Sequence, residues 1–240
     1  MTMTFPEFRS VRSVRSVAGE QVSHLATITP VTLTMPRRFG FYRNIVKRLL
    51  DVTAIVLAAP VVVPVVAALA TVVAVQGGKP FYTQTRIGKG GRLFRMWKLR
   101  SMVVDADDRM EAYLEANPAA RAEWDSTQKL QQDPRVTQFG QFLRRSSLDE
   151  LPQLWNVLIG DMSLVGPRPM MPNQQILYPG TAYYALRPGI TGYWQTAGRN
   201  RTTFEARAAF DATYEQDLTL MTDVRILART VGVVLNGTGV

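Results

Sequence analysis

The chain has 240 residues, and its 28 lysines and arginines outnumber its 19 aspartates and glutamates, which gives a formal net charge of +9. This charge favours anionic partners such as nucleic acid, anionic lipid or phosphorylated substrates. There is no cysteine and a single histidine, His24, so disulfides, zinc–thiolate sites and thiol nucleophiles are excluded. Catalytic groups must therefore be carboxylates, hydroxyls or lysines, and a bound metal would need oxygen ligands of the kind that suit Mg²⁺.

Residues 1–38 contain an Arg-Ser-Val repeat at 9–17 and a Thr- and Val-rich stretch, without sustained helical periodicity. This pattern predicts a basic, disordered tail. A signal peptide is not indicated, because polar residues at 19–21 interrupt the apolar core that such a peptide requires.

Residues 52–75 contain no charged side chain, and this run is longer than the roughly 18 to 20 residues needed to span a bilayer. Basic residues flank both of its ends, which places both ends on the cytoplasmic side. Pro60 and Pro64 lie in the middle, where each removes a backbone donor and clashes with the preceding turn. We expect a re-entrant helix that enters the membrane, breaks at these prolines and returns to the same face. An ordinary kinked transmembrane helix is the alternative that the prolines alone allow.

The rest of the chain is predicted to be mostly helical. A turn at 76–80 precedes an aromatic and basic strand or loop at 81–102, which would lie against the membrane surface. The spacing of apolar residues predicts a pair of surface helices at 103–130, interrupted at Pro118, and further helical regions at 135–159 and 204–235. The Pro- and Gly-rich connector 166–201 is long enough to suggest that it builds a site.

The segment 143–154 carries the residues best suited to chemistry. Arg144 and Arg145 precede an acidic pair, Asp149 and Glu150, and Ser147 is predicted to cap a helix with Glu150 completing a capping box. Asp149 would then lie in the first helical turn, where the helix dipole and the arginines favour its ionised, nucleophilic form. The same groups would hold a diphosphate, with Mg²⁺ offsetting the repulsion. From spacing alone, a plain cap with solvated arginines fits at least as well.

Several further patterns occur in a fixed order along the chain. They are Lys-Arg at 47–48 with Asp at 51, Gln-Thr-Arg-Ile-Gly at 84–88, Lys-Leu-Arg-Ser-Met at 98–102, Asp-Pro-Arg-Val-Thr at 133–137, Ser-Leu-Asp-Glu-Leu-Pro-Gln at 147–153, Gly-Asp-Met-Ser-Leu-Val-Gly-Pro-Arg-Pro at 160–169 and Arg-Pro-Gly-Ile-Thr-Gly at 187–192. Over nearly all of residues 41–235 the chain resembles the monotopic phosphoglycosyl transferases, bacterial sugar transferases that include undecaprenyl-phosphate galactose and glucose phosphotransferases. Val63 stands before Pro64 where the family usually has serine, which leaves the geometry of the membrane break open.

The resemblance implies roles for single residues. Asp149 would be the nucleophile that forms a phosphosugar–aspartyl intermediate, and Glu150 would orient it or act as a base. Mg²⁺ near Asp149 would neutralise the diphosphate. The residues expected to bind phosphate oxygens are Arg144, Arg145, Arg168, Lys98 and Arg100.

The predicted fold is mainly α with little β. Residues 1–38 form the tail, 39–78 the interfacial and re-entrant membrane helix, and 79–240 a cytoplasmic catalytic domain with membrane-surface helices. The protein would lie at the bacterial inner membrane with its catalytic head on the cytoplasmic face, where its basic surface attracts anionic lipid. A homo-oligomer is compatible with the sequence.

The predicted reaction moves a hexose 1-phosphate from a UDP-sugar to undecaprenyl phosphate, releases UMP and initiates exopolysaccharide or other surface glycan synthesis. Galactose is slightly favoured over glucose and N-acetylated sugars. One rival is a lipid-phosphate phosphatase that uses the same aspartate. Another is a non-catalytic, basic, membrane-tethered scaffold of a polysaccharide-assembly complex. The sequence has no Walker loop, zinc-finger pattern or nucleic-acid motif, so nucleic acid is not an expected partner.

Overall fold

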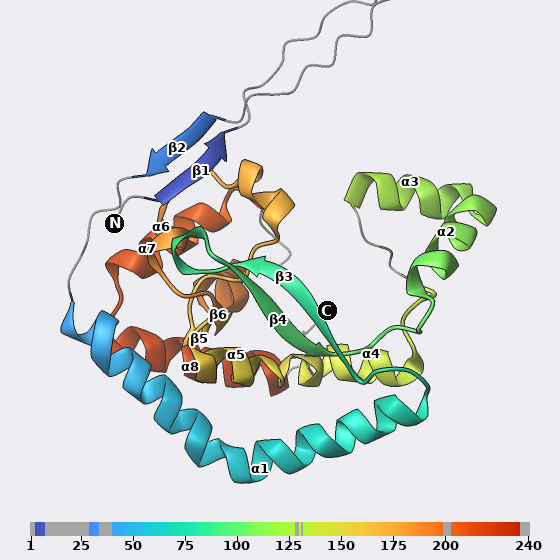
Figure 1. The fold of residues 1–240 in the computed structure, drawn as a ribbon, viewed down its shortest axis with the longest axis horizontal. Coiled ribbons are helices and arrows are strands. Elements are labelled where there is room, and N and C mark those ends of the chain that lie inside the picture. The colour runs from blue at the N-terminus through green and yellow to red at the C-terminus, as the bar shows by residue number, and fades with distance from the viewer. Residues whose placement is uncertain are drawn as a thin grey trace, which may run out of the picture.

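The computed structural model describes residues 3–7, 29–33, 40–127, 130, 132–198 and 203–235. The described residues form a mainly helical protein with short two-stranded sheets (Figure 1), which confirms the predicted helical character. The helices are α1 (Lys47–Val75), α2 (Ala106–Ala116), α3 (Pro118–Thr127), α4 (Gln138–Arg145), α5 (Gln153–Ile159), α6 (Ala182–Ala185), α7 (Arg207–Gln216) and α8 (Leu220–Leu235). The strands are β1 (Met3–Glu7), β2 (Thr29–Leu33), β3 (Phe81–Ile87), β4 (Leu93–Leu99), β5 (Ser163–Val165) and β6 (Gly189–Thr191).

Helix α1 contains the predicted apolar run and follows directly on a π-helical turn, Tyr42–Val46. Together they form the one helix of the described chain that is long and apolar enough to cross a membrane. The predicted break at Pro60 and Pro64 is wrong, because the backbone stays helical through both residues and only bends (Figure 1). Each proline removes a single backbone donor, and the hydrogen bonds of the flanking turns keep the helix continuous.

Both ends of α1 contact the same body of the protein. At its start, the Lys47 ammonium lies 2.6 Å from a carboxylate oxygen of Asp223 on α8. Near its end, Val73 is 2% exposed and packs in a cluster with Leu99 of β4. No residue from 56 to 69 is buried. The apolar middle of the helix therefore faces outward while both of its ends are held.

The segment predicted as a strand or loop at 81–102 is the antiparallel hairpin β3–β4. Gly90 and Gly91 make its turn with φ angles of 71° and 78°, a region that glycine adopts without a Cβ clash. Along β4, Phe94 and Met96 are buried in the core. Because side chains alternate along a strand, Lys98 projects from the same inner face.

Each helical region predicted from periodicity is a pair of helices. Pro118 is the first residue of α3, where its missing N–H leaves no helical hydrogen bond unmade. The region 135–159 contains α4 and α5, separated by a 3₁₀ turn at Leu148–Glu150, and the region 204–235 contains α7 and α8. The connector 166–201 carries α6, β6 and a further π-helical turn, Trp194–Gly198.

Within residues 1–38, β1 and β2 pair in an antiparallel sheet. The other residues of this segment lie outside the described residues, so the disordered tail stays a prediction. The predicted domain boundaries at 38 and 78 also stay predictions.

Candidate functional site

The turn that carries Asp149 and Glu150 begins at a strained residue. Ser147 follows α4 with φ 56° and ψ 19°, in the left-handed region, which costs a residue other than glycine about 1–2 kcal/mol. The chain then makes the single 3₁₀ turn Leu148–Glu150 before α5 begins. This reversal carries Asp149 inward, where the residue is 8% exposed.

The predicted capping box is wrong. Ser147 makes no side-chain hydrogen bond to the turn that follows it, and that turn is a 3₁₀ turn rather than the start of an α-helix. A capping residue needs an extended backbone to aim its hydroxyl at the helix, and the left-handed backbone of Ser147 does not provide it. The Glu150 carboxylate accepts a hydrogen bond from Lys98 at 2.8 Å.

Lys98 links the two carboxylates of the predicted dyad. Its ammonium lies 2.8 Å from Oε1 of Glu150 and 3.6 Å from Oδ2 of Asp149. The inner face of β4 supplies Lys98, and the turn after α4 supplies both acids, so segments about fifty residues apart in sequence meet here. The Lys98 ammonium therefore pairs with both carboxylates.

Burial raises the pKa of Asp149 above its ordinary value. The Lys98 ammonium opposes this rise, the Glu150 carboxylate adds to it, and the Arg144 guanidinium opposes it further. The expectation that the helix dipole and the arginines favour the ionised form of Asp149 is therefore wrong, because loss of solvent raises its pKa more than the nearby positive charges lower it. Perturbed carboxylates of this kind are concentrated at functional sites.

A small, partly open cavity lies beside this cluster. Three basic side chains, Arg86, Lys98 and Arg168, line it together with Glu150 and Gln153. They come from β3, β4, the turn after α4, the start of α5 and the connector after β5. The cavity thus places a buried carboxylate next to cations that can bind phosphate oxygens.

Three arginines gather around the Pro-Arg-Pro segment at one side of this cavity. Arg207 of α7 donates to the carbonyl of Arg168 at 2.7 Å, and its guanidinium lies 5.0 Å from the ring centroid of Trp194. Arg86 donates to the carbonyl of Pro169 at 3.2 Å, whereas its buried Nε has no hydrogen-bond partner in the described residues. Burial, and next the charge of Arg168, lower the pKa of Arg86 to about 10. The combined positive charge of the three arginines favours the binding of an anion.

The other basic residues predicted to bind phosphate do not line the cavity. Arg144 donates from Nε to the Ser101 hydroxyl at 2.9 Å. Arg145 is exposed at the end of α4. Arg100 donates to backbone carbonyls at the C-terminal end of α1. Phosphate binding by these three arginines stays a prediction.

Arg86, Arg207 and Asn156 were not singled out from the sequence. Asn156 of α5 is fully buried; its Nδ2 donates to the carbonyl of Arg95 at 2.7 Å, and its Oδ1 accepts from the Trp97 N–H at 3.0 Å. It therefore fixes α5 against β4 beside Lys98. The available signal was an amide side chain within an otherwise apolar helical stretch. Arg86 lies in the 84–88 pattern, but no local spacing predicts that it meets Arg168.

Asp149 and Glu150 are the residues that could hold the predicted Mg²⁺. The described residues contain no group of three or more acidic or histidine side chains that could hold a metal on its own. Mg²⁺ in phosphotransfer sites is commonly bound by one or two carboxylates together with substrate phosphates and water. The two carboxylates fit such a partial donor set.

Comparisons with known proteins identify the family of the chain. Residues 42–237 match the model of the family described as Bacterial sugar transferase. The chain is 44% identical over 195 residues to the UDP-galactose-lipid carrier transferase of Erwinia amylovora, across 80% of this chain and 41% of that protein. It is 37% identical over 236 residues to the undecaprenyl-phosphate galactose phosphotransferase of Salmonella typhimurium, across 98% of this chain and 49% of that protein. It is 46% identical over 157 residues to the exopolysaccharide production protein ExoY of Sinorhizobium fredii, across 65% of this chain and 70% of that protein.

The chain spans less than half of the length of the first two of these relatives. The family match nevertheless includes the β3–β4 hairpin, the Asp149 turn and the arginine cluster, which build the site, and it also includes α1. The chain belongs to the bacterial sugar transferase family.

Proposed function

We propose that this protein is a phosphoglycosyl transferase that moves a hexose 1-phosphate from a UDP-sugar to undecaprenyl phosphate and initiates an exopolysaccharide or another surface glycan. The observation that carries the proposal is the buried Asp149 carboxylate beside a cavity lined by Arg86, Lys98 and Arg168. The names of the Salmonella and Sinorhizobium relatives support the lipid acceptor and the glycan product.

In the proposed first step, a carboxylate oxygen of Asp149 attacks the phosphorus that bears the sugar. The bond from this phosphorus to the bridging oxygen breaks, and UMP leaves with that oxygen. In the second step, a phosphate oxygen of undecaprenyl phosphate attacks the same phosphorus, which releases the Asp149 carboxylate and leaves the sugar on a lipid diphosphate. Splitting the transfer into two displacements is the advantage of covalent catalysis.

The surrounding residues have distinct roles in this proposal. Lys98 holds the two carboxylates in place through its contacts at 2.8 and 3.6 Å, and Glu150 orients Lys98. Arg86 and Arg168 bind the phosphate oxygens of the donor. Mg²⁺, when it is bound at Asp149 together with the donor, would neutralise part of the diphosphate charge.

The proposed reaction is tested by supplying membranes that contain the protein with undecaprenyl phosphate, Mg²⁺ and one UDP-sugar at a time. UMP release with a hexose donor, and recovery of the sugar in the lipid fraction, are expected. Recovery of the phosphate in water would favour the phosphatase. Absence of UMP release with every donor tested would favour the scaffold.

Replacing Lys98 by glutamine should move the acid limb of the pH–rate profile to higher pH. Asp149 attacks only when ionised, and Lys98 is the main group that lowers its pKa against the effect of burial. Without the ammonium the pKa rises further, so activity is lost at a higher pH as the solution is acidified. Single-turnover UMP release across a pH series measures this shift. Lys98→Arg keeps the charge and should keep the limb near its original position; an unchanged limb in Lys98→Gln would rule out this electrostatic role.

We also infer that α1 enters a single leaflet of the inner membrane and returns to the cytoplasmic face. Two observations support this topology: both ends of α1 contact the catalytic body, and residues 56–69 between them are not buried. A straight span would require the two ends to lie on opposite sides of the bilayer. The basic residues on both flanks fit the same face.

The absence of cysteine from the chain makes this topology testable with single introduced cysteines. Ile45→Cys and Lys79→Cys, before and after the bend, should both react with an impermeant maleimide in inside-out vesicles and stay unreactive in intact spheroplasts. Val61→Cys, which is 69% exposed and follows Pro60 in the apolar run, should be protected by lipid in both preparations. Reaction of residues 45 and 79 from opposite faces would show a straight transmembrane helix instead.

A further inference from the structure

Gln153, the first residue of α5, lines the cavity beside Asp149, and none of the steps proposed for sugar transfer uses it. It is 2% exposed, and its side-chain amide has no hydrogen-bond partner in the described part of the chain. The fully enclosed side-chain atoms that lack a partner in that part belong to Arg86 and Gln195. The Gln153 amide therefore still reaches solvent, and the cavity that it lines provides the opening.

An amide in this position is unfavourable for folding unless something binds to it. The glutamine side chain carries two N–H donors and an acceptor oxygen, and enclosing these groups without partners costs free energy. Nearly all buried polar groups in proteins have a partner, so an exception beside a catalytic carboxylate indicates a ligand or an ordered water.

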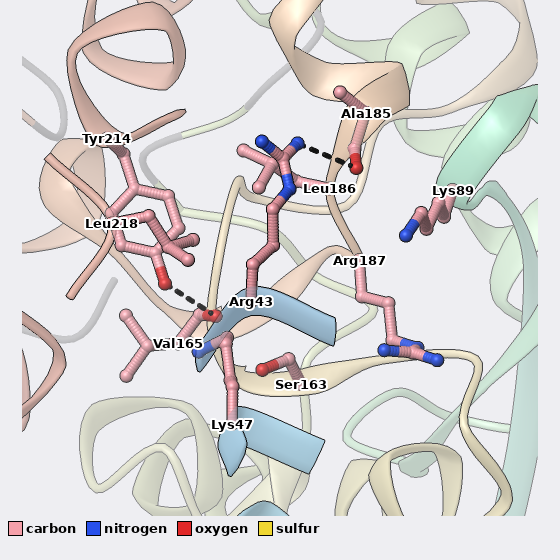
Figure 2. A pocket seen from close by; sticks show the side chains of 10 residues that line it. All are labelled: Arg43, Lys47, Lys89, Ser163, Val165, Ala185, Leu186, Arg187, Tyr214 and Leu218. Atoms are coloured by element: carbon pink, nitrogen blue, oxygen red, sulfur yellow. Dashed lines mark hydrogen bonds between the residues drawn. The ribbon is translucent and has the colours of Figure 1, made fainter. Parts of the chain in front are cut away.

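The hollow at the start of α1 provides a comparison (Figure 2). Its buried polar side chains, Lys47, Ser163 and Tyr214, all have hydrogen-bond partners within the protein. Tyr214, for example, donates to the carbonyl of Val165 at 3.2 Å, as Figure 2 shows. The protein itself satisfies these groups, whereas it leaves the amide of Gln153 available.

Gln153 lies on the same face of its helical segment as the two carboxylates. The backbone at Leu151 and Pro152 is right-handed helical, so the 3₁₀ turn continues into α5 without a reversal. Residues three and four positions apart on a helix are neighbours on one face. Gln153 follows Asp149 by four residues and Glu150 by three, which places its side chain beside the carboxylate that attacks phosphorus.

The geometry of the proposed transfer indicates which part of the donor reaches this place. In an in-line displacement the attacking and leaving oxygens lie on opposite sides of the phosphorus, and the other three oxygens surround it. For a sugar 1-phosphate, two of these three oxygens are charged and the third carries the sugar. The sugar therefore lies close to the attacking carboxylate of Asp149, whereas the leaving UMP lies on the far side.

The chemistry of the lining side chains separates the sugar from the charged oxygens. Arg86 and Arg168 are cations that suit the charged phosphate oxygens. Among the described residues that line the cavity, Gln153 has the one uncharged side chain that can both donate and accept a hydrogen bond. A sugar hydroxyl also donates and accepts, so it matches an amide better than a charged oxygen does.

We propose that the Gln153 amide forms a hydrogen bond with a hydroxyl group of the donor sugar. Gln153 is then a substrate-binding residue that orients the sugar 1-phosphate for attack by Asp149. The inference rests on the proposed transfer reaction, and it adds the residue that contacts the sugar to the cations that contact the phosphates.

The test measures binding without turnover, by isothermal titration calorimetry of the full chain carrying Asp149→Asn, in detergent micelles with Mg²⁺. The probes are UDP-galactose, UDP-glucose and UDP, which lacks the sugar. Adding Gln153→Met keeps the length of the side chain and removes its amide. This change should weaken binding of the tighter UDP-hexose about fivefold, the effect of one neutral hydrogen bond, and should leave the affinity for UDP unchanged.

Gln141→Met is the matched control, because it makes the same chemical change on the exposed surface of α4. It should leave the affinity for all three ligands unchanged. Gln153→Met should also keep the denaturant midpoint of unfolding, since its amide has no partner in the described part of the chain. A lower midpoint would show that Gln153 has a structural role instead.

The binding data can also overturn the proposal. Equal weakening of UDP and UDP-hexose binding by Gln153→Met would assign the amide to a phosphate. Unchanged binding of every ligand would show that the amide contacts only water, and binding of UDP without either UDP-hexose would show that no hexose enters the cavity. Failure of the proposed transfer is read separately, as absence of UMP release with every UDP-sugar from the chain that keeps Asp149.

Discussion

Replacing Asp149 by asparagine is expected to reduce UMP release by a factor of about 10⁴ or more, the range found when a covalent nucleophile or its partner is removed. The amide keeps the size of the side chain but cannot form the bond to phosphorus. A donor labelled in its sugar, supplied without undecaprenyl phosphate, should leave label on the wild-type protein and none on the variant. Hydroxylamine should release that label, because the bond is an acyl phosphate.

Asp125→Asn is the matched control for this experiment, since it makes the same chemical change on the exposed surface of α3. It should keep full UMP release and full labelling. Label that persists on Asp149→Asn would contradict the covalent mechanism.

Replacing Asp223 by alanine is expected to destabilise the protein by about 3–5 kcal/mol, because it leaves a buried cation without its partner. Asp223 is 5% exposed and accepts hydrogen bonds from the Lys47 ammonium at 2.6 Å and from the hydroxyls of Tyr42 at 2.7 Å and Tyr214 at 2.6 Å. These bonds join the start of α1 to α7 and α8. Denaturant unfolding in detergent micelles, followed by tryptophan fluorescence, measures the loss.

The exposed Asp125→Ala should change the free energy of unfolding by no more than about 0.5 kcal/mol. Combining Lys47→Met with Asp223→Ala should recover part of the lost stability, because the double variant no longer buries an unpaired charge. If Asp223→Ala were as mild as the control, the ion pair would not hold the start of α1 to α8.

Much of the architecture was predictable because it depends on local sequence. An uncharged run at 52–75 predicts a membrane helix by itself, since the cost of burying charge in hydrocarbon is a property of each residue. Apolar spacing predicted the helical regions and Pro118 predicted the division between α2 and α3. The geometry of the boundaries was less predictable: within the region 135–159 an α-helix was expected to begin after Ser147, whereas the left-handed Ser147 leads into a 3₁₀ turn before α5.

The candidate site was predictable in composition but not in geometry. Sequence patterns had named Asp149, Glu150, Lys98 and Arg168. In the structure, Glu150, Lys98 and Arg168 line one cavity, and Asp149 lies beside it in contact with Lys98. Arg86 was not named, although it lines the same cavity. Its meeting with Arg168 is set by the packing of β3 against a connector more than eighty residues further along the chain.

By itself, the sequence determined the long apolar helix, the mainly helical fold and the ordered patterns of the family, because each of these depends on residues within a few positions of one another. Only the tertiary structure decided that α1 bends without breaking, that Ser147 does not cap a helix and that the pKa of Asp149 is raised. It also decided which arginines share a cavity. Burial, desolvation and the sum of charges at one point depend on distant segments in contact, and local spacing carries no information about those contacts.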